Sequence, residues 1–144
     1  MIAASIFEAS CVIFGGIWVG AAIYGAAVES PSRESDVRAA QIQVRNIYKS
    51  AAIMQAGTSN LSLLTAVISF GLTRDWVMLA SAVCTVALLG ITVVFILPIN
   101  RKILGEVETD SELKEMMETW QKWHILRTVF GMGAFLTALS TGWK

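Results

Sequence analysis

Three long stretches of this chain contain no charged residue, and this feature limits the available folds more than any other. They run from Ala9 to Val28, from Ser50 to Leu72 and from Trp76 to Ile99. A helix needs about 20 consecutive apolar residues to cross the ~30 Å hydrocarbon core of a bilayer. With 55% hydrophobic residues, 15% charged residues and a mean hydropathy of +0.62, the chain is also too apolar for an ordinary soluble domain. The sequence therefore predicts an integral membrane protein.

A fourth apolar stretch, near the C-terminus, is too short to cross a membrane without taking in charged residues. Residues 128–143 supply only 16 positions without charge, which at about 1.5 Å per residue cover ~24 Å. A fourth span must therefore draw Arg127, and His124 with it, to the membrane edge or inside. Because exposure of such groups to lipid is costly, we expect them to face the helix bundle. The alternative is that Arg127 snorkels to lipid phosphate.

These stretches predict one all-α domain over residues 1–144, an integral membrane four-helix bundle. The first stretch is predicted to be a retained span, because it lacks the basic leader of a secretory signal and carries Glu8. Glu8 is expected at the membrane edge, with a buried functional acid as the alternative. The predicted spans cover about residues 5–28, 50–72, 76–99 and 123–143.

The segments between the spans are polar. Residues 35–49 are predicted to form a short amphipathic helix near the membrane surface, and the third span is predicted to end at Pro98–Arg101. A solvated helix from about Ser111 leads into the fourth span. Most of the lysine and arginine lies in the two long connections and the adjoining helix ends, which indicates the cytoplasmic side for them. Both termini are therefore predicted on the non-cytoplasmic side.

Several functional classes receive no support from the sequence. The formal net charge is zero and no basic tract contains interleaved aromatics, so a nucleic-acid partner is not predicted. Cys11 and Cys84 lie inside apolar runs, which indicates unreactive thiols rather than a disulfide framework. His124 is the only histidine and no Cys/His cluster exists, so neither a metal nor another cofactor is predicted. A haem or metal bound through His124 stays open as an alternative.

Polar groups are expected to gather at the end of the bundle that holds the two long connections. Deeper in the second span, Gln55 shares a helical stripe with Tyr48 and Ser59. Such a stripe on a lipid-embedded helix indicates either interhelical hydrogen bonds or the polar wall of a pocket. Polar groups that converge on an apolar cavity are a common form of ligand site. The groups at this end are Glu29, Arg33, Tyr48, Asn100, Arg101, His124 and Arg127.

Four short motifs carry a resemblance to a known family. They are Pro31-x-Arg33 after the first span, Pro98-x-Asn100-Arg101 closing the third, Trp120-x-x-x-His124-x-x-Arg127-Thr128, and a Gly/Ala/Phe-rich run from Gly131 to Phe135. In their order and spacing the chain resembles the small four-span membrane family that includes fungal anthrone oxygenases of polyketide pathways. Ile99 stands where members of that family often have threonine.

The resemblance implies an oxygenase that converts an anthrone to an anthraquinone with dioxygen and without an established redox cofactor. His124 would be the general base, Arg127 the partner of the substrate oxyanion, and Asn100 would orient the ring oxygen. The remaining candidates would bind an aromatic, phenolic substrate: Tyr48, Gln55, Trp120, Trp123, Arg33 and Arg101.

A second reading belongs to a different class. In it, the chain is a non-catalytic subunit of a larger membrane complex or a homo-oligomer. His124 and Arg127 would then bind a partner or a lipid headgroup, and the glycines and tryptophans would make helix and lipid contacts. An open cavity beside His124, or its absence, discriminates between the two readings. The partners expected are thus the lipid bilayer with either a hydrophobic aromatic molecule or a protein.

Overall fold

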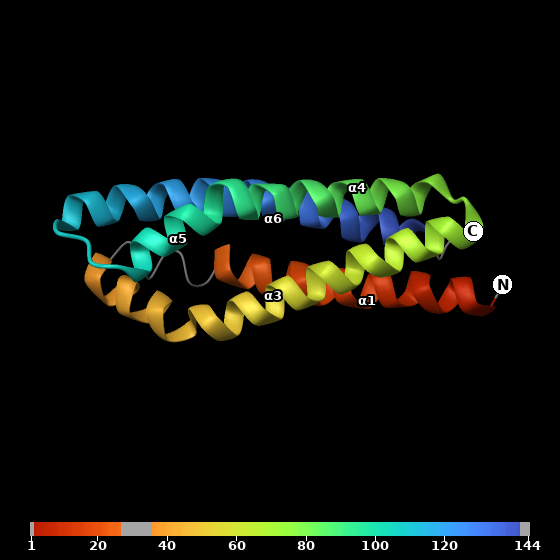
Figure 1. The fold of residues 1–144 in the computed structure, drawn as a ribbon, viewed down its shortest axis with the longest axis horizontal. Coiled ribbons are helices and arrows are strands. Elements are labelled where there is room, and N and C mark those ends of the chain that lie inside the picture. Colours follow the sequence, from red (N-terminus) through yellow and green to blue (C-terminus); the bar gives the residue numbers. More distant parts are fainter. Residues whose placement is uncertain (1, 27–35, 142–144) are drawn as a thin grey trace.

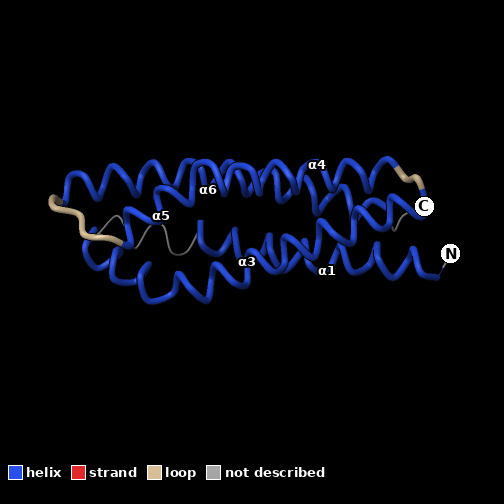
Figure 2. The backbone as a smooth tube through the Cα atoms, in the orientation of Figure 1, coloured by secondary structure: helices blue, strands red, loops and turns tan. Residues whose placement is uncertain are grey.

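The computed structural model describes residues 2–26 and 36–141, and this part of the chain is helical without strands (Figures 1 and 2). Four long helical segments make an all-α bundle, as the sequence predicts. The third of them is continuous through a π-helical segment, η2, into a short helix, α5. The elements are α1 (Ile2–Tyr24), α3 (Val37–Thr73), α4 (Trp76–Ile91), η2 (Thr92–Ile96), α5 (Leu97–Leu104) and α6 (Asp110–Thr141).

The helices pack as a ring in which α1 and α4 each contact α3 and α6. Figure 1 shows the start of α1 and the end of α6 at the same end of the bundle. Small side chains fill much of the interior, so the helices approach closely. One core cluster is Cys11, Ala66, Met78, Ala82 and Ala138; a second, nearer the middle, is Trp18, Val19, Ala22 and Leu88.

The outer surface of the bundle carries many large apolar side chains, as a lipid-facing surface does. In the described part of the chain, three helical segments are long and apolar enough to cross a membrane: Ile2–Tyr24, Val37–Thr73 and Trp76–Leu104. The structure thus has the features of an integral membrane protein. The crossing of the membrane by α6 and the side on which the termini lie stay predictions from the sequence.

The helix α3 is longer than the sequence suggests. It is a single helix of 37 residues from Val37, and no boundary separates the predicted amphipathic segment 35–49 from the second span. Asp36 starts it, since its side chain accepts hydrogen bonds from the backbone N–H groups of Arg38 and Ala39. No glycine or proline lies between Val37 and Ala56, so nothing in the backbone interrupts the helix.

The third long segment also continues past its predicted end at Pro98–Arg101, as far as Leu104. A proline ring clashes with the carbonyl four residues before it, here that of Val94, and normally kinks or ends a helix. The π-helical segment η2 precedes Pro98, and its wider turn relieves this clash. Segments of π-helix are frequent at functional sites, and η2 borders the cavity described below.

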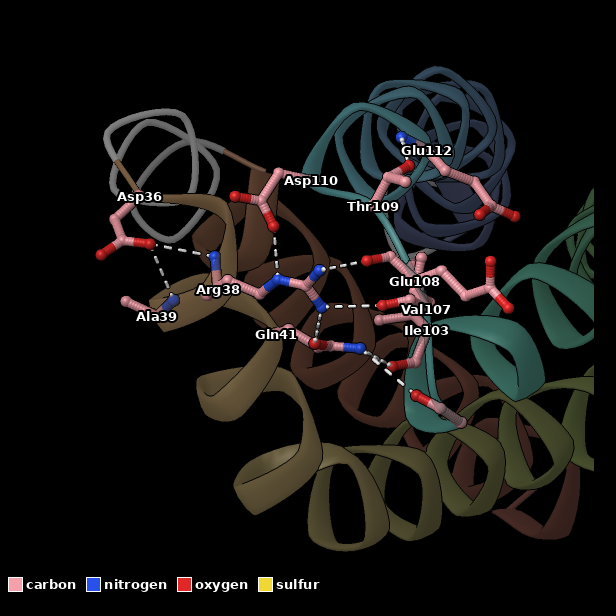
Figure 3. A network of polar contacts seen from close by, with 11 residues as sticks. Asp36, Arg38, Ala39, Gln41, Ile103, Val107, Glu108, Thr109, Asp110 and Glu112 are labelled. Atoms are coloured by element: carbon pink, nitrogen blue, oxygen red, sulfur yellow. Dashed lines mark hydrogen bonds and ion pairs between the residues drawn. The ribbon is translucent and has the colours of Figure 1, made fainter.

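A polar network, here called the clasp, ties the start of α3 to the connection between α5 and α6 (Figure 3). Arg38 forms an ion pair from Nε to Asp110, at 2.5 Å, and its two terminal nitrogens donate to the carbonyls of Val107 and Glu108. Gln41 Nε2 donates to the carbonyl of Ile103 at 2.8 Å and, at 3.3 Å, to that of Gly105, which also accepts from Arg45. The clasp thus holds α3 to the α5–α6 connection at this end of the bundle.

Replacing Gln41 with alanine is expected to destabilise the protein by about 1–3 kcal/mol, because it leaves a buried carbonyl without its donor. Gln41 is only 4% exposed and donates to Ile103 and Gly105. Thermal unfolding in detergent checks this, with the exposed Gln43 changed to alanine as the control. Equal midpoints for the two variants would contradict the stabilising role of the clasp.

Candidate functional site

A cavity of about 480 Å³ lies inside the bundle, at the end nearer the clasp. All four long segments contribute to its wall, which is mainly apolar. Six of the residues singled out from the sequence line it, from α3, α5 and α6. They are Tyr48, Gln55, Asn100, Trp120, His124 and Arg127.

Arg127 is turned into the bundle and is only 5% exposed. Its Nη2 donates to Gln55 Oε1 at 2.8 Å and to His124 Nδ1 at 2.9 Å, and its Nη1 donates to Thr92 Oγ1 at 3.4 Å. The guanidinium carbon also lies 5.7 Å from the centre of the Trp18 ring, a cation–π contact. This geometry fits the expectation of an inward-facing arginine and not one that snorkels to lipid phosphate.

The positive charge of Arg127 has no carboxylate partner in residues 2–26 and 36–141. A guanidinium has five N–H donors, and the three hydrogen bonds described above use three of them, so two remain. One of these, on Nε, is buried and without a partner. A buried charge that is not compensated is strongly unfavourable, so this wall of the cavity is suited to a ligand that brings negative charge.

His124 is 2% exposed and its tautomer follows from its neighbours. Because a guanidinium only donates, Nδ1 must accept the bond from Arg127. Nε2 lies 3.3 Å from the carbonyl oxygen of Ala22, which only accepts, so Nε2 carries the proton. The imidazole is therefore neutral, and its ring stacks on Trp120 with centroids 4.5 Å apart.

The structure does not bring every candidate to the cavity. Trp123 points elsewhere and stacks on Phe95, with ring centroids 3.8 Å apart. Arg101 is exposed and does not line the cavity, and Glu29 and Arg33 fall outside the described residues. Glu8 is half-buried at the opposite end, where it accepts a hydrogen bond from Ser69.

Two residues of the site were missed in the sequence. Trp18 and Thr92 both line the cavity and both contact Arg127. Trp18 is an apolar residue within an apolar stretch, so nothing in the sequence distinguishes it from its neighbours. Thr92 is the only polar residue between Thr85 and Asn100, and this isolation was a usable signal.

No group of three His, Cys, Asp or Glu side chains that could hold a metal ion occurs among the residues that the structure describes. A metal or haem on His124 would have to displace either Arg127 from Nδ1 or Ala22 from Nε2. In the structure His124 and Arg127 instead bind each other.

The fold and the site define a class: a helical bundle of membrane-protein character with a ligand-sized interior cavity and a buried His–Arg pair in its wall. Within this class the sequence identifies a particular family. A sequence model of the anthrone oxygenase family matches residues 44–137, and the chain belongs to that family. The match includes the six cavity residues taken from α3, α5 and α6, but not Trp18 on α1. No curated protein and no solved structure matches the chain.

Proposed function

We propose that this protein is a membrane-embedded oxygenase that oxidises an anthrone-like aromatic, phenolic substrate with dioxygen. The observation that carries the proposal is the buried pair of His124 and Arg127 in the wall of an apolar cavity. Membership of the anthrone oxygenase family supports it at the level of reaction class.

The cavity suits a flat aromatic molecule of moderate size. Its volume of about 480 Å³ lies within the range of roughly 300–1,000 Å³ that is usual for small-molecule sites. Trp18, Tyr48 and Trp120 supply aromatic surface to its wall. Asn100, 8% exposed and on the same wall, supplies an amide that can orient a ring oxygen.

The reaction proposed needs no redox cofactor to balance. A base removes a proton from the anthrone methylene carbon, which gives an enolate whose charge rests largely on oxygen. The enolate reduces dioxygen, a C–O bond forms, and the peroxide takes the proton back from the base to give a hydroperoxide. Loss of the second methylene proton and cleavage of the O–O bond then give the anthraquinone carbonyl and one molecule of water.

His124 and Arg127 have complementary roles in this scheme. The enolate oxygen attracts the guanidinium, whose charge lacks a carboxylate partner in the described part of the chain. As Arg127 moves its Nη2 donor from His124 to the substrate, Nδ1 of the imidazole becomes available to accept the proton. Binding of the substrate anion and release of the base are thus coupled through one hydrogen bond.

The proposal is tested by incubating the protein in lipid nanodiscs with an anthrone and measuring oxygen uptake and anthraquinone absorbance together. One dioxygen consumed for each anthraquinone formed is expected. Replacing His124 with alanine is expected to lower kcat by about 10²–10⁴-fold, the usual contribution of a general base. The matched control is alanine at the exposed Lys122 on the same helix. Wild-type rates in the His124→Ala variant would remove the assignment.

The accessory-subunit reading makes a different prediction. It does not require a cavity beside His124, and the structure contains one. Co-purification with a stoichiometric protein partner, combined with no anthrone turnover, would nevertheless favour it. An absorption spectrum of the same preparation shows whether a haem is bound.

A further inference from the structure

The cavity reaches the side of the bundle as well as its interior. Five of the residues that line it are exposed: Tyr24 on α1, Met54, Ala56 and Asn60 on α3, and Val93 on η2, which is 60% exposed. Ala56, Asn60 and Val93 mark its lateral opening. Asn60 lies near the middle of the charge-free stretch Ser50–Leu72. The lateral opening is therefore at the depth of the hydrocarbon core and not at a polar end.

The helical pattern shows which pair of helices this opening separates. Ala56, Leu63 and Phe70 are seven residues apart and share one face of α3. Leu63 and Phe70 pack on the core cluster that contains Met78 of α4, and the Phe70 ring lies 5.6 Å from that of Trp76. Ala56 is thus on the side of α3 that faces the third helical segment, where Val93 lies.

The line of contact between α3 and the third helical segment is here called the seam. The packing along this seam changes with depth. Near Phe70, α3 and α4 are held together by large side chains, whereas α3 contacts η2 only sparsely. At the level of η2 the α3 side of the seam presents two alanines, Ala52 and Ala56. Small side chains facing a widened helical turn leave the seam open at this level.

Where α3 meets the α5–α6 connection, by contrast, the polar end of the bundle is tied together. There the clasp joins α3 to the connection between α5 and α6, and Gln41 at its centre is buried (Figure 3). A ligand that passed from water between α3 and the α5–α6 connection would have to break this network, whereas one dissolved in the bilayer meets apolar side chains and Asn60 at the lateral opening.

Asn60 is the one polar side chain at the lateral opening. Its Nδ2 donates to the carbonyl of Ala56 at 2.7 Å. Its Oδ1 accepts no hydrogen bond from any described residue, which is unfavourable for a side chain facing lipid. An oxygen in that position can accept the O–H of a phenol as it passes.

We infer that the ligand enters the cavity sideways from the lipid, between α3 and η2, with Asn60 as its first polar contact. This inference rests on the proposed function for its aromatic ligand but not for any chemical step. It makes Ala52, Ala56 and Asn60 determinants of access, distinct from the residues that hold the bound ligand.

The route is tested by the kinetics of binding, with unreactive anthraquinone as the probe. Protein in nanodiscs is mixed with anthraquinone, and quenching of tryptophan fluorescence is followed, since Trp18 and Trp120 line the cavity. Obstructing a route slows association and release equally and leaves Kd unchanged. In Ala56→Phe both the association rate and the release rate are expected to fall by about tenfold or more, while Kd changes by less than about twofold.

Three further variants make the result specific. Gly57→Phe adds the same bulk one residue away, where an added Cβ meets nothing within 4 Å, and is expected to leave both rates unchanged. Ala56→Leu is expected to give a smaller slowing of the same kind. Gln41→Ala loosens the clasp and is expected to leave the rates as they are.

Three results would overturn the inference. Unaltered rates in Ala56→Phe would exclude the route, and faster binding in Gln41→Ala would then place it at the polar end. A changed Kd with unchanged association would make Ala56 part of the bound-ligand site. If anthraquinone does not quench the wild-type protein at all, the aromatic ligand of the proposed function fails with the route. Slowed binding without turnover of an anthrone would leave the route standing and remove only the oxygenase activity.

Discussion

Replacing Arg127 with methionine is expected to lower kcat for an anthrone by about 10²–10³-fold, the usual loss when a donor to a developing oxyanion is removed. Methionine keeps most of the volume but removes the charge and all five donors. Lysine at this position is expected to recover little, because its point charge cannot serve Gln55, Thr92 and the substrate oxygen together.

The same substitution is expected to leave the fold largely intact. Removal of a buried charge that no described carboxylate compensates is favourable, and this offsets the loss of hydrogen bonds to Gln55 and His124. Arg127→Met should therefore lose activity while its thermal unfolding midpoint stays close to that of the wild type. Lys114→Met on the same helix is the control for the loss of one positive charge at an exposed position. A parallel loss of activity and stability would show that Arg127 is structural instead.

Replacing Gly131 with alanine is expected to destabilise the protein by about 1–3 kcal/mol, as overpacking of a well-packed core does. A Cβ on Gly131 would lie 2.1 Å from Cζ3 of Trp18 and 2.7 Å from its Cε3. Trp18 is 3% exposed and has little room to retreat. Because its ring also lies against Arg127, displacement of Trp18 is expected to lower activity as well.

Gly133 provides a matched control two residues along α6. A Cβ there would lie 3.6 Å from the sulfur of Cys84, which is ordinary contact. Since alanine favours a helix over glycine by about 1 kcal/mol, Gly133→Ala is expected to be neutral or stabilising. Thermal unfolding should thus show a lowered midpoint for Gly131→Ala and an unchanged or raised midpoint for Gly133→Ala. Adding Trp18→Leu to Gly131→Ala should recover part of the stability, and failure to do so would place the strain elsewhere.

The helices were predictable because the thickness of the bilayer sets the length of a membrane span, and charged residues mark where an apolar stretch must end. That rule locates apolar stretches and not the ends of helices. It therefore treated Arg45 and Lys49 as the limit of a separate element, whereas α3 passes through both without a break. In the same way Pro98 was taken as an end, although η2 makes room for it.

The cavity wall was predictable where polar residues stand out from an apolar background. Tyr48 with Gln55, and His124 with Arg127, recur at helical spacing and so had to face the bundle. Helical periodicity shows toward which side of the helix a side chain points, but not which group it contacts. It did not show that Arg127 bonds to His124 rather than to a carboxylate, that Trp123 pairs with Phe95, or that Trp18 underlies the site.

The π-helical segment η2 has a consequence for Asn100. One additional residue in a helix rotates everything beyond it by about 100°. Asn100 and Ile103, which follow η2, are the two residues of α5 that are buried. The side of the bundle toward which Asn100 points is therefore determined by the phase of the backbone two turns earlier and not by its immediate neighbours.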